Sequence, residues 1–177
     1  MDWWTKRPKH QTHAVRPYGR PSVTEISPTL LIGEFPRPQD IAWLKAEFAV
    51  TAVHNLQDDE DLALNGLRER ELAETYRESG IKIVRTPIQD GSADAMAERL
   101  SDALGALDNL IGAGERVYLH CNAGLNRAPT LAIAYLRAHG EMSLDEACAH
   151  VKARRACGPF MTILEDYFGP RHHKPGK

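Results

Sequence analysis

The sequence lacks any apolar run long enough to cross a membrane, and its N-terminus lacks the apolar core of a signal peptide. It has only three cysteines, an odd number without regular spacing, which argues against a disulfide framework and favours a reducing compartment. We therefore expect a cytoplasmic protein that does not insert into a membrane.

A large excess of one charge is also lacking, because the formal net charge is −2 over 177 residues. This balance favours neither nucleic acid nor an anionic lipid surface as a partner. Metal-ligand spacing is lacking as well, since His172 and His173 are adjacent but have no spaced partners. We expect no metal, no other cofactor and no nucleic-acid partner.

The chain does have the composition of an ordinary globular protein, 42% hydrophobic and 26% charged, and a length that suits one domain. Residues 1–21 are basic and almost free of aliphatic side chains, which predicts a flexible N-terminal arm. We assign residues 22–169 to a single domain and residues 170–177 to a solvated C-terminal tail.

Strands and helices alternate along this domain. Four apolar runs predict buried strands, at 30–32, 50–56, 81–84 and 117–120. Helices are predicted between them: one capped by Asp40, a charged one over 62–79 closed by Gly80, and one over 93–111. Alternation of this kind predicts an α/β fold with a central, mostly parallel sheet flanked by helices.

The stretch 117–130 organises the chemistry. A β-prone run leads into a loop that holds Cys121, Gly124 and Arg127, and an apolar helical run follows at 131–136. Backbone amides on such a loop can turn inward at the positive end of a helix, which makes an anion-binding cradle with a thiol at its floor. The sheet also places this loop at the carboxyl end of a strand, where α/β proteins bind ligands.

Phosphate monoesters fit this arrangement. Arg127 offers a planar fork for two phosphate oxygens, and the helix terminus, the amides and Arg127 all favour the thiolate of Cys121 as the nucleophile. His120 faces away from the cradle if the strand alternates, so we expect it to order the loop by hydrogen bonding. The residues predicted to bind phosphate are Asn122, Ala123, Gly124, Leu125, Asn126 and Arg127.

A proton donor for the leaving oxygen is predicted at Asp90. This residue lies on the loop after the strand at 81–84, at the same edge of the sheet as Cys121. Asp94 is the alternative, but we place it in the first turn of the next helix. The rate should rise as Cys121 ionises and fall as Asp90 deprotonates.

The signature His120-Cys121-x5-Arg127 resembles that of the cysteine-dependent (protein tyrosine) phosphatase superfamily. An acid that precedes the cysteine is similar to the order in its dual-specificity branch. The resemblance implies that residues 22–169 are a phosphatase catalytic domain, and that turnover passes through a cysteinyl-phosphate intermediate.

Further segments resemble the plant starch-excess glucan phosphatases and laforin, above all 55–61, 117–125 and 154–159. This implies a glucan phosphatase. Asn126, Ala128 and Gly91 depart from the pattern. Asn126 stands where these relatives have glycine; asparagine tolerates left-handed backbone angles, so the loop can still close, and its side chain is expected to narrow or polarise the edge of the cradle. Ala128 is expected to slow breakdown of the intermediate. Sugar-stacking aromatics would be sought among Tyr18, Phe35, Trp43 and Phe160, although core roles are favoured for all four.

Other readings stay open. The substrate could instead be a phosphotyrosine protein or a small inositol or lipid phosphate ester, and the chain could be a phosphate- or glycan-binding module of weak activity. Cys157 could form a redox pair with Cys121. The acidic run 58–61 is interpreted as a solvated loop and helix start.

Overall fold

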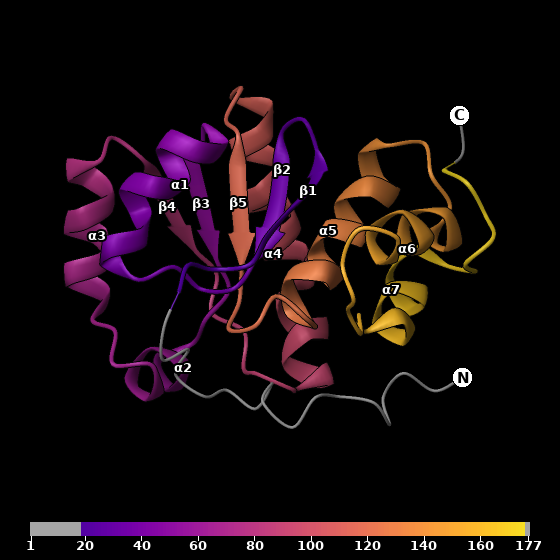
Figure 1. The fold of residues 1–177 in the computed structure, drawn as a ribbon. Coiled ribbons are helices and arrows are strands. Elements are labelled where there is room, and N and C mark those ends of the chain that lie inside the picture. The colour runs from indigo at the N-terminus through magenta and orange to yellow at the C-terminus, as the bar shows by residue number, and fades with distance from the viewer. Residues whose placement is uncertain (1–18, 176–177) are drawn as a thin grey trace.

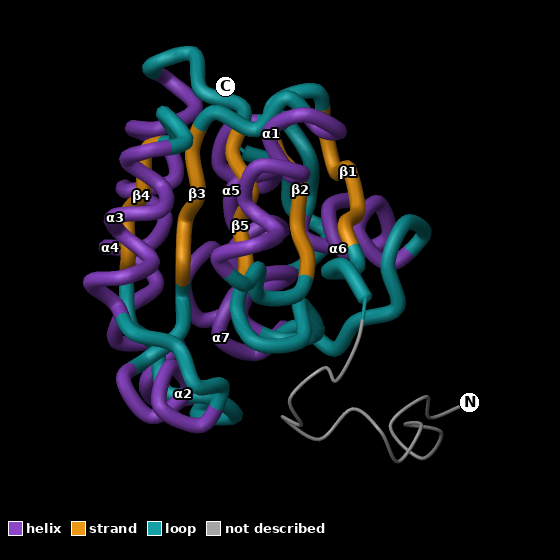
Figure 2. The backbone as a smooth tube through the Cα atoms, turned by 60° about the vertical axis from the view of Figure 1, so that its left-hand side comes forward, coloured by secondary structure: helices purple, strands orange, loops and turns teal. Residues whose placement is uncertain are grey.

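A computed structural model describes residues 19–175. It has five strands and eight helical segments in the described part of the chain, and no described helix is long and apolar enough to cross a membrane. The strands lie side by side in the order β1-β2-β5-β3-β4, as Figure 2 shows, and helices cover both faces (Figure 1). The predicted α/β fold with a central sheet flanked by helices is confirmed.

Strand pairing makes the sheet mostly parallel. β2 (Leu30–Gly33), β5 (Val117–His120), β3 (Ala52–Asn55) and β4 (Lys82–Arg85) all run in one direction. A fifth strand that the sequence did not predict, β1 (Val23–Ser27), is half-buried and pairs with β2 in the antiparallel sense.

Side-chain alternation along the strands divides the core into two layers. Leu30, Ile32, Val117 and Leu119 pack with α4 (Ala93–Gly112), α5 (Arg127–His139), α6 (Leu144–Lys152) and α7 (Met161–Phe168). Leu31 and Tyr118 point to the opposite face and pack with α1 (Ile41–Phe48) and α3 (Glu69–Glu78). The three inner strands β2, β3 and β5 are buried at every position, as a sheet covered on both faces requires.

The predicted helix over 62–79 is wrong. The chain instead forms α2 (Asp59–Leu64) and α3, separated by a turn in which Gly66 has φ +66°. Asp58 and Asp61 close a reciprocal capping box at the start of α2, so this helix begins three residues earlier than expected. Glycine in the left-handed region ends α2 and lets the chain reverse towards α3.

Asp40 stands at the N-cap position of α1, as predicted, but the bond made by its side chain is not a cap of that helix. A short 3-10 turn, η2 (Pro38–Asp40), precedes α1, and the Asp40 carboxylate accepts the backbone N–H of Arg37 at 3.0 Å. Its side chain makes no capping hydrogen bond to α1.

The C-terminal segment is only partly a solvated tail. Arg171 and Lys174 pair with Glu165 and Glu146 on α7 and α6, at 2.6 Å and 3.0 Å. The domain boundaries at 21/22 and 169/170 stay predictions, since most of the N-terminal arm lies outside the described residues.

Candidate active site

Four parallel strands end side by side, and their loops meet at one edge of the sheet. The last residues of the strands are in register: Gly33 and Asn55 both pair with His120, and Arg85 pairs with Asn55. The segments that follow the four strands therefore start at the same level. The loop after β5 is the central one, between the loops of β2 and β3.

Cys121 and Gly124 shape the floor and the bend of this central loop. Cys121 is 3% exposed and follows β5 directly. Gly124 has φ +64°, and a Cβ atom there would lie 2.5 Å from the carbonyl oxygen of Gly33. Both the backbone conformation and the close approach of β2 therefore require glycine at this position.

The carbonyl groups of residues 121–126 are all bonded on the outer side of the loop. His120 Nδ1 lies 3.2 Å from the carbonyl oxygen of Cys121, and the backbone N–H of Phe35 donates to that of Asn122 at 3.0 Å. At the far end, the backbone N–H and the hydroxyl of Thr130 donate to the carbonyl of Asn126 at 2.9 Å and 2.7 Å.

Arg155 holds the middle of the loop. Its Nη2 donates to the carbonyl of Ala123 at 2.9 Å and its Nε to that of Gly124 at 2.7 Å, while the N–H of Gly158 donates to Leu125 at 2.8 Å. Because the C=O and N–H of a peptide unit point in opposite directions, outward carbonyls turn the amides of 122–127 towards the inside of the loop. The result is an anion cradle with fixed donors.

Arg127 begins α5, and its side chain is fully buried. Its Nη1 donates to Asp61 Oδ2 at 2.6 Å and to the carbonyls of Ile88 at 2.6 Å and Leu56 at 3.3 Å. Its Nη2 lies 2.9 Å from Asp90 Oδ1, and its Nε has no hydrogen-bond partner among residues 19–175. Nη1 is therefore committed to the scaffold, which leaves the edge formed by Nε and Nη2 for a ligand.

Surrounding groups keep Arg127 charged. Burial alone lowers the pKa of its guanidinium, but the nearby Cys121, Asp90 and Asp61 outweigh burial and raise that pKa. A permanent positive charge thus stands beside the thiol and the amides.

Asp61 corrects the interpretation of the acidic run 58–61 as solvated. It is 3% exposed, and its carboxylate binds Arg127 and the side-chain amide of Asn122. The signal that could have indicated this residue is the Asp58-x-x-Asp61 spacing, because a capping box fixes the direction of the fourth side chain. Neither the role of Asp61 nor that of Arg155 was predicted from the sequence.

The loop after β4 brings Asp90 to the cradle and leaves Asp94 outside it. Asp90 contacts Arg127, as described, whereas Asp94 lies in the first turn of α4, where the sequence placed it. Ser92 caps this helix by accepting the N–H of Ala95 at 3.1 Å. The cap fixes where the loop ends and the helix starts.

His120 is buried and neutral. Burial lowers the pKa of His120 from 6.5 to about 3, although its hydrogen bond to the Cys121 backbone opposes the shift. A neutral ring can donate to a carbonyl only if Nδ1 carries the proton. The ring stacks on Tyr118 with centroids 5.8 Å apart, on the sheet face opposite the core residues Leu119 and Cys121.

Asn126 closes the loop without a left-handed backbone conformation, since its φ is −121°. Its side chain donates to the carbonyl of Gly158 at 2.7 Å and so ties the loop to the segment before α7. Ala128 is fully buried in the first turn of α5.

The three cysteines are free thiols. Burial raises the pKa of Cys157 to about 11, so this thiol is protonated at neutral pH. Its pairing with Cys121 stays a prediction, as does the cytoplasmic location.

Three of the four candidate aromatics are described, and none is a freely exposed platform. Phe35 is buried, Phe160 packs against the core, and Trp43 lies edge-on to Phe48 with the guanidinium of Arg20 4.7 Å above its ring. Tyr18 lies outside the described residues. Beside the cradle there is instead a hollow of 180 Å³, lined by Asp58, Glu60, Asp61, Leu64, Gln89 and Asp90.

Comparison with known proteins defines the class. Residues 37–164 match the family "Dual specificity phosphatase, catalytic domain", and the chain therefore belongs to that family. This confirms the dual-specificity branch that the cysteine signature predicted.

Individual proteins of known name are similar to the chain. Dual specificity protein phosphatase 2 of Homo sapiens is 30% identical over 138 residues, 78% of this chain and 40% of that protein. Phosphoglucan phosphatase DSP4, amyloplastic, of Castanea sativa is 33% identical over 147 residues, 79% and 38% of the two chains. Laforin of Mus musculus is 28% identical over 154 residues, 81% and 46%. The chain spans less than half the length of each of these relatives.

A solved structure shares the fold. "Crystal structure of Tk-PTP in the active form" superposes with a TM-score of 0.69 and 23% identity, over 82% of this chain and 95% of that one.

Proposed function

We propose that the protein is a cysteine-dependent phosphatase that hydrolyses phosphomonoesters through a cysteinyl-phosphate intermediate. The observation that carries the proposal is the complete set of outward carbonyl bonds around residues 121–126, since it aims six amides at one point above Cys121. A tetrahedral oxyanion satisfies those amides and the Nε–Nη2 edge of Arg127 together.

Two displacement steps follow from this geometry. The Cys121 thiolate attacks phosphorus, the ester P–O bond breaks, and Asp90 gives its proton to the leaving oxygen. Water then attacks the phosphocysteine, Asp90 takes one of its protons, and inorganic phosphate and the thiolate are released. In this scheme Arg127 stabilises the charge on the equatorial oxygens, and His120 orders the loop without exchanging a proton.

Hydrolysis of p-nitrophenyl phosphate tests the proposal. Wild type should turn the ester over, and Cys121→Ser should not, while it should still bind tungstate in the cradle. Cys148→Ser is the matched control, because Cys148 lies half-buried on α6, away from the loop, and this variant should retain activity. Binding of tungstate by wild type without hydrolysis at any pH would favour the binding-module alternative.

For the substrate, we propose a phosphorylated glucan. Support comes from the likeness to a plant phosphoglucan phosphatase and to laforin, and from the hollow beside Asp90. Four of the side chains that line this hollow are acidic. Carboxylates can accept hydrogen bonds from sugar hydroxyls, whereas they repel a second phosphate group on the leaving group. The charge therefore favours a neutral polyol over an inositol or lipid polyphosphate.

A phosphotyrosine protein is the second candidate, supported by the likeness to dual specificity protein phosphatase 2. Phosphate release from amylopectin, a tyrosine phosphopeptide and an inositol bisphosphate should be compared at equal phosphate concentration. We expect the largest kcat/KM for amylopectin and the smallest for the bisphosphate. A preference for the phosphopeptide would replace the glucan proposal.

A further inference from the structure

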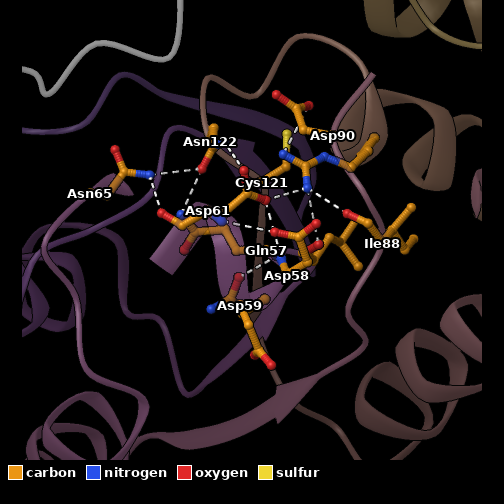
Figure 3. A network of polar contacts seen from close by, with 12 residues as sticks. Gln57, Asp58, Asp59, Asp61, Asn65, Ile88, Asp90, Cys121 and Asn122 are labelled. Carbon is orange, nitrogen blue, oxygen red and sulfur yellow. Dashed lines mark hydrogen bonds and ion pairs between the residues drawn. The ribbon is translucent and has the colours of Figure 1, made fainter. Parts of the chain in front are cut away.

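Asn122, the residue after Cys121, has a buried side-chain amide that contacts three side chains from the segment 57–65 (Figure 3). Its Oδ1 accepts hydrogen bonds from Gln57 Nε2 at 2.7 Å and Asn65 Nδ2 at 3.1 Å, and its Nδ2 donates to Asp61 Oδ1. Asn65 Nδ2 also donates to the backbone carbonyl of Asp61 at 2.8 Å. That bond fixes which end of the Asn65 amide is nitrogen, and so fixes the orientation of the Asn122 amide.

Asp61 links Asn122 to Arg127. Its Oδ1 accepts from Asn122, and its Oδ2 accepts from Arg127 Nη1 at 2.6 Å. The capping box holds Asp61 in place, because its N–H donates to Asp58 Oδ1 at 2.8 Å and its Oδ2 accepts the N–H of Asp58 at 3.1 Å. One buried carboxylate therefore joins the residue after the nucleophile to the residue that closes the cradle.

This link controls the edge of Arg127 that a ligand meets. The Nη1 group is bonded to Asp61 Oδ2 and to the carbonyls of Leu56 and Ile88, so the position of the Asp61 carboxylate helps to set the orientation of the guanidinium. Rotation of that carboxylate would turn the Nε–Nη2 edge away from the amides. The amide of Asn122 opposes this rotation because it holds the second carboxylate oxygen.

The other two side chains of the network, Gln57 and Asn65, each have one polar atom that the network does not bond. Gln57 Oε1 and Asn65 Oδ1 have no hydrogen-bond partner in the described part of the chain, although both side chains are buried. Replacing Asn122 by an apolar residue would leave the Gln57 amide and Asp61 Oδ1 without this partner. Asn126, the other amide side chain of the loop, bonds to Gly158 and is not part of the network.

We infer that Asn122 is a positioning residue for tetrahedral oxyanions, which acts on Arg127 through the carboxylate of Asp61. We name Asn122, Asp61 and Arg127 the Asp61 clasp. The inference rests on the proposed function and specifies how its phosphate site is held in shape. Gln57 and Asn65 support the clasp from behind, and neither touches the oxyanion.

Tungstate binding measures the clasp without turnover. In the Cys121→Ser background, calorimetry should compare Asn122→Ala, Asp61→Asn and the double variant. Each single change is expected to weaken tungstate binding about tenfold, less than the roughly hundredfold effect of a full 1 Å misplacement of such a group. The double variant should bind about as well as Asp61→Asn alone, since both changes break the same link. Asn109→Ala, an exposed asparagine on α4, is the matched control and should bind normally.

Kinetics provide a second readout in protein that keeps Cys121. Asn122→Ala should lower kcat/KM for p-nitrophenyl phosphate about tenfold, and Asn65→Ala should produce a smaller change in the same direction. A thermal melt shows whether Asn122→Ala folds. If it does not, Asn65→Ala tests the clasp in its place.

The outcomes separate the inference from the function on which it rests. If the losses of tungstate affinity in the two single variants multiply in the double variant, the clasp is overturned. Folded Asn122→Ala that binds tungstate as tightly as the parent protein would overturn it too. If Asn122→Ala is unfolded, unchanged tungstate affinity in Asn65→Ala has the same meaning. Failure of the wild type both to bind tungstate and to hydrolyse the aryl phosphate would refute the proposed function instead.

Discussion

Arg127 and Asp90 form an ion pair across the mouth of the cradle, with Nη2 2.9 Å from Oδ1. The same Nη2 belongs to the edge of the guanidinium that faces the amides. A bound phosphate would therefore compete with Asp90 for this group, and its arrival would transfer Arg127 from the acid to the substrate. In the proposed mechanism, where Asp90 is the proton donor, this contact would couple substrate binding to the release of Asp90 from Arg127.

Asp90→Asn tests whether Asp90 protonates the leaving group. The variant keeps the cradle but has no proton to give, so kcat for an alkyl phosphate should fall about 10²–10⁴-fold. The loss should be smaller for p-nitrophenyl phosphate, whose leaving group needs little protonation, and the falling limb of the pH profile should disappear. Asp94→Asn is the control, since Asp94 is exposed on α4. Unchanged alkyl turnover in Asp90→Asn would remove Asp90 from the mechanism.

The guanidinium group of Arg155 should be needed for activity because of its two bonds to the loop carbonyls, and not only because of its charge. Arg155→Lys retains the positive charge but cannot bond to the carbonyls of Ala123 and Gly124 together. We expect kcat/KM for p-nitrophenyl phosphate to fall about tenfold or more as the amides lose their alignment. Arg154→Lys should have little effect, because Arg154 is exposed in the turn after α6 and its side chain donates to the carbonyl of His150 on that helix. Equal kinetics for the two variants would show that these two bonds of Arg155 are dispensable.

Asp61→Asn should destabilise the folded protein. The change leaves the fully buried Arg127 charge without its strongest scaffold partner, which costs about 3 kcal/mol or more in the free energy of unfolding. Asp59→Asn is the matched control two residues away. Asp59 pairs with Arg85 but its side chain is 91% exposed, so its loss should cost less than about 1 kcal/mol. Urea denaturation of both variants measures the difference, and similar midpoints would argue against a strong buried pair.

His54 should make stability depend on pH. Burial lowers its pKa from 6.5 to about 4, so between these values the unfolded chain binds a proton that the folded protein excludes. The free energy of unfolding should therefore fall as pH drops from about 6.5 to about 4, by about 3 kcal/mol from this residue. His54→Gln, which can still bond to Thr86, should flatten the slope, whereas exposed His172→Gln should not. Parallel slopes for wild type and His54→Gln would contradict the assignment.

Local patterns sufficed for much of the fold. The apolar run before Cys121 and the helix predicted over 93–111 both gave elements where they were expected, because each depends on neighbours in the sequence. The break between α2 and α3 was missed since the charged periodicity continues across Asn65 and Gly66. Here tertiary packing and one left-handed glycine outweigh a pattern that favours a single helix.

The candidate site divides in the same way. Cys121, Gly124 and Arg127 lie in one short loop, so their grouping follows from the sequence. Asp61 stands among four consecutive acidic residues, and nothing local tells which of them turns inward to a guanidinium far along the chain. Arg155 is hidden similarly, because a second arginine precedes it and only the fold decides which one reaches the loop.

The outward carbonyl bonds of the loop have a consequence for the end of the reaction as well as for its start. A cradle whose amides are already aimed inward costs little to occupy, and inorganic phosphate is a tetrahedral oxyanion of the same size as the group that was cleaved. The product should therefore stay bound with an affinity near that of simple esters. Accumulating phosphate would then inhibit the enzyme. The concentration of free phosphate would set the fraction of the protein whose cradle is empty.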